Sequence, residues 1–320
     1  NHANCSNRTE HHGSSDGHAG PGVFTVNASG NLQQVDCSAN MARDLSWSVS
    51  TMDLDGNNDQ LMISATFKQE TGVETAYLRG WYLSAYHSGN DISNRATGDI
   101  SGQGLAAGLY GVARRPSGLA FDYLLGAFAG QHDFDLDFSR TRGAISAKGH
   151  YRYFGANWRL GLSGETDVSD LPVRPQLFIS GTNADAKAAK VTARRGDQVD
   201  KGKVPVRSFS QQRVTTALNF VDLLADPDLL LSLEPRGFCE DSSLSKGEEC
   251  GYGIAARFEK TWDSSSSAYA KFDYEELDRF QRTAIGGGYS WQIEGGSFSS
   301  GITINSDGSR TLENRFQLSF

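Results

Sequence analysis

The stretch that decides the fold is TLENRFQLSF, residues 311–320, at the C-terminal end of the chain. Apolar and polar side chains alternate along it, and the apolar phase holds Leu312, Phe316, Leu318 and Phe320. Alternation with a period of two predicts a strand with one apolar and one polar face. Two architectures end in such a strand: a closed β-barrel and a soluble β-sandwich with this strand at its edge. The rest of the chain has to decide between them.

The composition of the 320-residue chain fits strands that cross a membrane. Mean hydropathy is -0.45, and no segment reaches the roughly 18 continuous apolar residues of a transmembrane helix. Only every second residue of a barrel strand faces lipid, so a membrane barrel predicts a low mean hydropathy. The net charge of -8 argues against nucleic acid as a partner.

The chain changes in character near residue 43. Residues 1–43 are rich in His, Ser, Gly and Asn, and we expect them to form a polar N-terminal segment that acts as a linker, a plug or a passenger remnant. Residues 44–320 show one alternating segment after another and are expected to form the barrel.

The four cysteines fall into two local pairs, Cys5 with Cys37 and Cys239 with Cys250. Their even number and the lack of a CxxC motif favour disulfides in an oxidising compartment over a zinc site. We therefore predict two disulfides, no metal site and no cofactor.

The alternation predicts an all-β, closed antiparallel transmembrane barrel of fourteen strands, with twelve as the alternative. An even number is what a closed single-chain bacterial barrel requires. The last strand is expected to close against the strand near residues 45–49. Short periplasmic turns are expected at 69–74, 114–118, 167–172 and 294–296, and longer outer loops at 88–102, 138–148, 183–206 and 239–250.

The polar faces of the later strands carry charges of both signs. A water-filled lumen can hold such charges by pairing or solvation, whereas the dry core of a sandwich could not. Trp and Tyr near strand ends also suit a membrane interface. Both features favour the barrel. The predicted lumen-lining residues are Arg159, Glu165, Arg174, Arg213, Glu234, Arg236, Arg257, Glu259, Lys271, Asp273 and Glu275.

Several segments resemble the translocator domain of autotransporters, the proteins of type V secretion. They are GLYGVARRPSGLAFDYLLGAF (108–128), GANWRLGLSGETDV (155–168), PVRPQLFISG (172–181), SLEPRG (232–237) and SAYAKFDYEEL (267–277). The resemblance implies a barrel whose preceding segment threads the pore and whose passenger reaches the cell surface. Family barrels usually have twelve strands, so the hairpin at 298–320 is a surplus. The C-terminal strand also looks like that of Gram-negative outer-membrane barrels, which implies an assembly signal at Phe316, Leu318 and Phe320.

The expected function is that of an outer-membrane autotransporter-type barrel that anchors or translocates its N-terminal segment or passenger at the cell surface. Two alternatives remain: a monomeric general-diffusion porin, and a surface anchor or receptor that binds a partner through its outer loops. The expected partners are the lipid bilayer with lipopolysaccharide, the barrel-assembly machinery and a passenger or surface protein. We do not expect an enzyme, because His87, His132 and His150 are accompanied by no GxSxG motif and no metal-binding spacing.

Overall fold

All strands of the described residues belong to one sheet in which neighbouring strands are antiparallel. The computed structural model describes residues 8–20, 23–54, 58–72, 75–93, 96–139, 144–168, 171–224, 226, 228–243, 247–263, 265–277 and 280–319. None of these residues belongs to a helix long and apolar enough to cross a membrane.

The strands follow one another along the chain. They are β1 (Arg8–Gly20), β2 (Val23–Asp36), β3 (Met41–Leu54), β4 (Asn58–Thr71), β5 (Tyr77–Ser93), β6 (Thr97–Arg114), β7 (Ala120–Phe138), β8 (Ile145–Ser163), β9 (Thr166–Val168), β10 (Leu171–Ala186), β11 (Ala189–Arg195), β12 (Gln198–Val204), β13 (Phe209–Phe220), β14 (Leu229–Ser242), β15 (Glu249–Asp263), β16 (Ser266–Leu277), β17 (Phe280–Ile293), β18 (Gly296–Asn305) and β19 (Arg310–Ser319).

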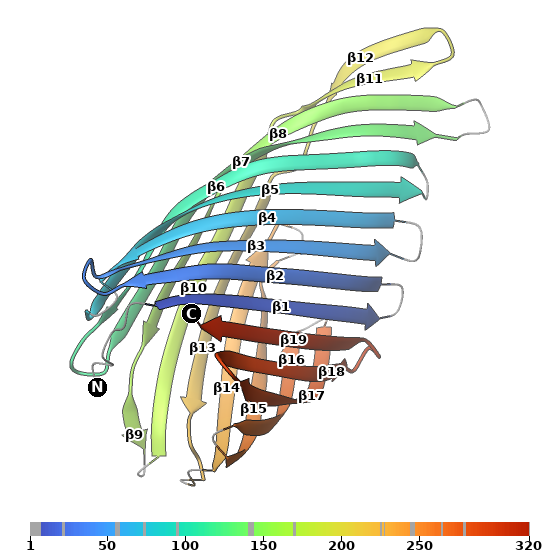
Figure 1. Ribbon diagram of the computed structural model, residues 1–320. Helices are drawn as coiled ribbons and strands as arrows, with labels where there is room; N and C mark the ends of the chain where they lie inside the picture. The colour runs from blue at the N-terminus through green and yellow to red at the C-terminus, as the bar shows by residue number, and fades with distance from the viewer. Residues whose placement is uncertain are drawn as a thin grey trace.

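The sheet closes into a barrel because β1 pairs with both β2 and β19 (Figure 1). Sixteen of the described strands form the ring: β1 to β8, β10 and β13 to β19. Of the other three, β9 pairs with the start of β10, while β11 and β12 form a hairpin beside the outer part of β8. The expected number of fourteen strands, and the alternative of twelve, were therefore wrong.

Ion pairs between strands that are not neighbours in the sheet identify the inner face of the ring. Lys271 on β16 lies 3.8 Å from Glu313 on β19, across β17 and β18. Neighbouring strands lie about 4.8 Å apart, so two side chains three strands away can meet only where the curved sheet makes them converge. These side chains point into the lumen. The antiparallel register then assigns every second residue of each ring strand to the lumen and the others to the outside.

The outward face carries the apolar side chains. Leu125 is 51% exposed, and the same holds on strands all around the ring, with Leu45, Leu105, Leu109, Phe154, Leu218, Ile285 and Leu312 in equivalent outward positions. The few buried hydrophobic residues of the described part are mostly Ala and Val. A soluble sandwich would bury its large apolar residues between two sheets. An apolar outer surface around a closed ring instead fits a hydrocarbon surrounding.

Aromatic side chains mark a boundary of this outer surface. At the end of the barrel where β19 finishes, Trp262, Tyr289, Trp291 and Phe298 contact one another in a row, with ring centroids 5.9, 4.8 and 5.2 Å apart. A row of outward Trp and Tyr at one level is typical of the interface between membrane and water.

The N-terminal segment is part of the wall. Residues 8–20 and 23–36, expected to be a linker, plug or passenger remnant, form β1 and β2. The last strand closes on β1, with Phe316 opposite Gly13, and not on the strand near residues 45–49. The outward residues of β1 are small or polar and give no apolar alternation: Thr9, His11, Gly13, Ser15, Gly17 and Ala19. Backbone pairing with β2 and β19 holds this strand in place, and the sequence pattern does not display such pairing.

The two ends of the barrel differ. Both described chain ends lie at one end, which we call the terminal end, and the opposite end is the far end (Figure 1). Connections at the terminal end are short, such as the turn between β6 and β7, where Gly118 has a φ of 80°. At the far end the strands run well beyond their expected limits: β5 and β6 extend to Ser93 and Thr97, and the expected loop 183–206 contains the β11–β12 hairpin. The long outer segments are thus largely hydrogen-bonded sheet.

Candidate functional site

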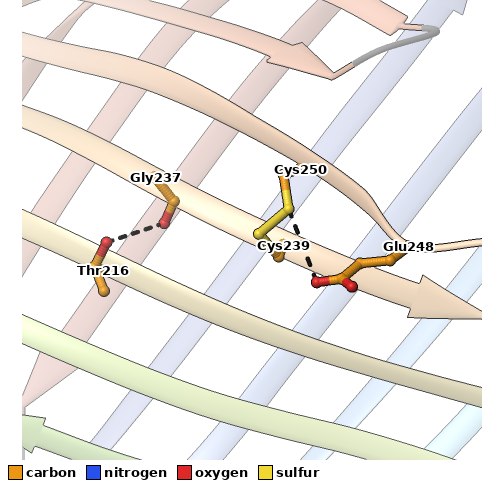
Figure 2. Close-up of a disulfide and its surroundings, with 5 residues drawn as sticks. All are labelled: Thr216, Gly237, Cys239, Glu248 and Cys250. Carbon is orange, nitrogen blue, oxygen red and sulfur yellow. Dashed lines mark hydrogen bonds between the residues drawn. A yellow bond between two sulfur atoms is a disulfide. The ribbon is translucent and has the colours of Figure 1, made fainter.

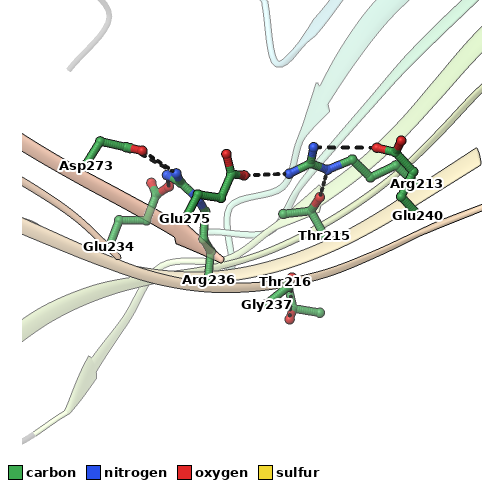
Figure 3. Close-up of polar contacts among 9 residues, drawn as sticks. All are labelled: Arg213, Thr215, Thr216, Glu234, Arg236, Gly237, Glu240, Asp273 and Glu275. Carbon is green, nitrogen blue, oxygen red and sulfur yellow. Dashed lines mark hydrogen bonds and ion pairs between the residues drawn. The ribbon is translucent and has the colours of Figure 1, made fainter. Parts of the chain in front are cut away.

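The lumen wall formed by β13, β14 and β16 carries a chain of ion pairs, which we call the ion-pair sector (Figure 3). Arg213 lies 3.0 Å from Glu275 and 3.8 Å from Glu240. Arg236 donates to both carboxylate oxygens of Asp273 at 2.9 Å and lies 3.8 Å from Glu234. Figure 3 shows Thr216 and Gly237 on the other side of the same wall. Each of the two arginines is thus neutralised by carboxylates from more than one direction.

A second group lies on β15, β16 and β19. Arg257 forms an ion pair with Glu259 at 2.9 Å and covers the ring of Tyr269, 4.6 Å from its centroid. Glu313 accepts ion pairs from Lys271 at 3.8 Å and from Arg315 at 3.5 Å. These side chains surround a niche of about 220 Å³. The niche is lined by both signs of charge and therefore offers no strong preference for either.

A third group lies at the terminal end. Arg159 is 3.8 Å from Asp122, and Arg174 is 3.3 Å from Glu165. All four line an open cavity of about 800 Å³. The eleven residues predicted to line the lumen are thus placed in three groups, and each of them has a partner of opposite charge.

Hydroxyl groups line the opposite part of the wall. Ser14 and Ser29 lie 2.6 Å apart on β1 and β2, Ser48 and Ser64 2.7 Å apart on β3 and β4, and Thr66 lies 2.8 Å from Ser84 on β5. These residues continue one another from strand to strand around a cavity of about 720 Å³. The hydroxyls satisfy one another, while Asp44, Lys68 and Arg315 also line this cavity, so its surface is polar and carries charges of both signs.

Aromatic rings cover the lumen face of β5 to β8. The Tyr82 ring lies over β6 and β7, where a Cβ on Gly108 would be 2.4 Å from the ring and a Cβ on Gly126 would be 2.2 Å from the hydroxyl. Only glycine leaves room for the ring to lie flat against the neighbouring strands. The same arrangement recurs with Tyr153 over Gly130 and Phe128 over Gly155. This packing keeps large side chains against the wall and so keeps the lumen wide.

The predicted disulfide between Cys239 and Cys250 is present (Figure 2). The two residues face each other directly on β14 and β15, with a Cα–Cα distance of 4.0 Å. Glu248 approaches them, but both sulfur atoms are in the disulfide and supply no thiolate to a metal. Cys37 is also disulfide-bonded. Its predicted partner Cys5 lies outside the described residues.

The residues of the expected assembly signal lie at the closing seam. Phe316 points outward from β19 and its ring covers Gly13 of β1, where a Cβ would lie 2.1 Å from the ring. Leu318 lies opposite His11 in the same pair of strands. Phe320 lies outside the described residues. Phe316 therefore has a structural role in sealing the ring, and the role in assembly stays a prediction.

Sequence reasoning missed several lumen residues. Glu240 lies on the same face of β14 as Arg236, but it falls within 239–250, which was expected to be a loop. Glu313 and Arg315 belong to the polar phase of the last strand, which could have placed them in the lumen. Tyr82 gave no signal, because aromatic residues occupy both faces of β5.

The ion-pair sector makes a prediction about charge selectivity. Replacing Arg236 by alanine leaves Asp273 and Glu234 without their main cation, so the lumen should favour cations. Replacing Asp273 by asparagine leaves Arg236 in excess and should shift selectivity in the opposite direction. The reversal potential in a bilayer under a salt gradient measures both. Shifts of the same sign in the two variants would show that these residues do not face the conducting path.

Comparison with known proteins supports the fold. No family model and no curated protein matches the sequence. Among solved structures, CdiB from Acinetobacter baumannii is similar with a TM-score of 0.56 and 10% identity, over 98% of this chain and 60% of that one. The toluene transporter TbuX from Ralstonia pickettii has a TM-score of 0.52 and 11% identity, over 99% of this chain and 90% of that one. The translocator domain of the autotransporter NalP from Neisseria meningitidis has a TM-score of 0.43 and 10% identity, over 100% and 90%.

The similarities to CdiB and TbuX show the fold that the chain shares with outer-membrane β-barrels. The chain spans only about three-fifths of CdiB. The similarity to autotransporter translocator domains, first noted in the sequence, is also found among the structures. At these identities it does not separate a translocator from a transporter.

Proposed function

We propose that this chain is an outer-membrane conduit of the translocator type, through which an extended polypeptide crosses the membrane. One observation carries the proposal: a closed ring that is apolar outside encloses a lumen lined by hydroxyls, paired charges and flat aromatic rings. Passage through such a lumen requires no catalytic group, cofactor or metal. The outer-membrane location, the surrounding lipid and the barrel-assembly machinery as partner belong to the same proposal.

The lumen suits a moving chain because each contact in it is weak. The arginines of the ion-pair sector are already paired with carboxylates, so a passing peptide meets no unpaired arginine in that part of the wall. Residues 8–20 and 23–36 are excluded as the cargo, because they form wall strands. The polypeptide that crosses is therefore either a segment of this protein outside the described wall strands or a separate chain.

A diffusion channel is the second candidate, and one observation favours it. Every described strand lies in the wall or in its extensions at the two ends, so none of the described strands occupies the lumen. Small polar solutes could then pass between the ion-pair sector and the hydroxyl-lined wall. The mixed charge predicts weak selectivity for such a channel.

Single-channel recording in a planar bilayer tests both proposals. Both predict a steady open conductance. A translocator should in addition show reversible blockades when an unfolded polar polypeptide is added, with durations that grow with peptide length. Steady conductance without blockades would support the diffusion channel instead. Absence of any conductance from correctly folded barrel would contradict both.

A further inference from the structure

The polarity of the sheet reverses at one level near the far end. On β7 the outward residues Leu125, Ala127 and Ala129 are apolar and exposed, but the next outward residue is Gln131, which accepts a hydrogen bond from Arg152 of β8 at 3.4 Å. Beyond it the outward positions of β7 hold Asp133, Asp135 and Asp137. Outward carboxylates are incompatible with hydrocarbon. The hydrocarbon layer around this side of the barrel therefore ends near Gln131 and Arg152.

Three lysines occupy the outward face of the extension beyond this level. The register places His150 of β8 beside Lys190 of β11 and Lys203 of β12, and it places Lys148 beside Thr192 and Lys201. Lys190, Lys201 and Lys203 are exposed, and we call them the lysine face. Figure 1 shows β11 and β12 beside β8 at the far end.

None of the three lysines of the lysine face is in an ion pair with a residue that the structure describes. Lys148 is paired with Asp135 of β7. Lys190, Lys201 and Lys203 make no such pair with any described residue, and Lys190 stands directly opposite Lys203. Like charges in directly opposed positions destabilise a strand pair. The three lysines line a groove of about 690 Å³ together with Lys148, His150, Thr192 and one carboxylate, Asp133, so cations outnumber anions there. A bound anion would relieve this repulsion.

The distance of the lysine face from the apolar outer surface indicates which class of anion it can bind. Phe154 is the last large apolar residue on the outward face of β8. Four residues of strand separate it from the level of Lys190 and six from that of Lys201, which is about 14 and about 20 Å along the strand. With a strand tilt near 40°, these levels lie about 10 and about 16 Å beyond Phe154 along the membrane normal. A phospholipid headgroup layer is only about 5–8 Å thick. The lysines reach past it, to the depth of a larger headgroup.

We propose that the lysine face binds the phosphate groups of a phosphorylated glycolipid of the lipopolysaccharide class in the leaflet around the far end. The proposal rests on the proposed outer-membrane location. Three ammonium groups on two adjacent strands match phosphates carried on neighbouring sugars, and Thr192 and His150 supply further hydrogen bonds. Binding there would hold the β11–β12 hairpin against the membrane surface.

Native mass spectrometry of the detergent-solubilised full chain, titrated with lipopolysaccharide, tests the proposal. The triple variant Lys190→Glu, Lys201→Glu and Lys203→Glu should bind at least about tenfold more weakly, because it loses three cations that attract the phosphates and gains three carboxylates that repel them. The control variant reverses three outward cations at the terminal end, Arg43, Arg79 and Lys260, and should bind as the unmodified chain does. Lipopolysaccharide with its phosphates removed should bind as weakly to the unmodified chain as intact lipopolysaccharide binds to the triple variant.

Three outcomes would overturn the proposal. The first is that the triple variant binds lipopolysaccharide with the same affinity as the unmodified chain. The second is that the unmodified chain binds dephosphorylated and intact lipopolysaccharide with the same affinity. The third is displacement of the lipid by inorganic phosphate at comparable concentration. Conductance is measured on the same samples. Normal conductance with unchanged lipid affinity in the triple variant refutes the lysine face alone, whereas absence of conductance in the unmodified chain refutes the proposed conduit.

Discussion

Deletion of residues 1–40 should abolish folding of the barrel. It removes β1 and β2, and with them the ten residue pairs that join β1 to β19. The remaining chain would present the edges of β3 and β19 to lipid. Each unpaired backbone group in hydrocarbon costs several kcal/mol, so an open edge of this length exceeds the 5–15 kcal/mol by which proteins are usually stable. The measurement is the mobility shift between unboiled and boiled protein on a denaturing gel, which we expect to be lost.

The control for this deletion removes two strands without opening the ring. Replacing residues 189–204 by a short glycine-serine turn eliminates β11 and β12, which pair only with each other and with the outer part of β8. This variant should keep its mobility shift. If the deletion of residues 1–40 also kept it, β3 would have to close directly on β19, and the ring of sixteen strands would not be required for folding.

Leu125→Arg should destabilise the barrel by about 2–4 kcal/mol, while Leu124→Arg, one residue away, should cost less than about 1 kcal/mol. Leu125 faces outward near the middle of the apolar zone, where an arginine has to be moved into hydrocarbon. Leu124 faces the lumen beside Arg159, where water solvates the new charge. The two variants change the same residue type on the same strand. The difference between their losses of unfolding free energy therefore depends only on whether the side chain faces outward or into the lumen. The free energy of unfolding in urea, with the barrel in lipid vesicles, provides the measurement. Equal losses in both variants would contradict the assignment of faces.

Much of the barrel could be predicted from alternation alone. On β19 the large apolar residues lie on one face and the charges on the other, and on β8 the outward face is apolar from Phe154 to Leu162; both strands lie where the alternation predicts a strand. Ten of the predicted lumen residues lie at inward positions of ring strands, and the eleventh, Glu165, follows the end of β8. A period of two assigns every residue of a strand to a face once a single one is known. The Cys239–Cys250 disulfide could also be predicted from local sequence, since both cysteines lie in one hairpin.

The number of strands could not be predicted in the same way. β1 is RTEHHGSSDGHAG, in which no outward position holds a large apolar side chain. Its place in the wall depends on backbone hydrogen bonds to β2 and β19. Such bonds do not depend on the type of side chain, so they leave no pattern in the sequence. For the same reason the far-end hairpins were expected as loops, although their strands continue the sheet beyond the membrane with the polarity of the two faces reversed.

The sequence by itself determined the class of the protein, the phase of most strands and the chemical nature of the two faces. These are local properties, and TLENRFQLSF already displays them. Only the tertiary structure decided which strand closes the ring, how many strands it contains and which charges meet across it. Arg213 and Glu275 are far apart in the sequence and on strands that are not neighbours. Their contact exists because the closed sheet curves, and curvature is a property of the whole ring that no single strand encodes.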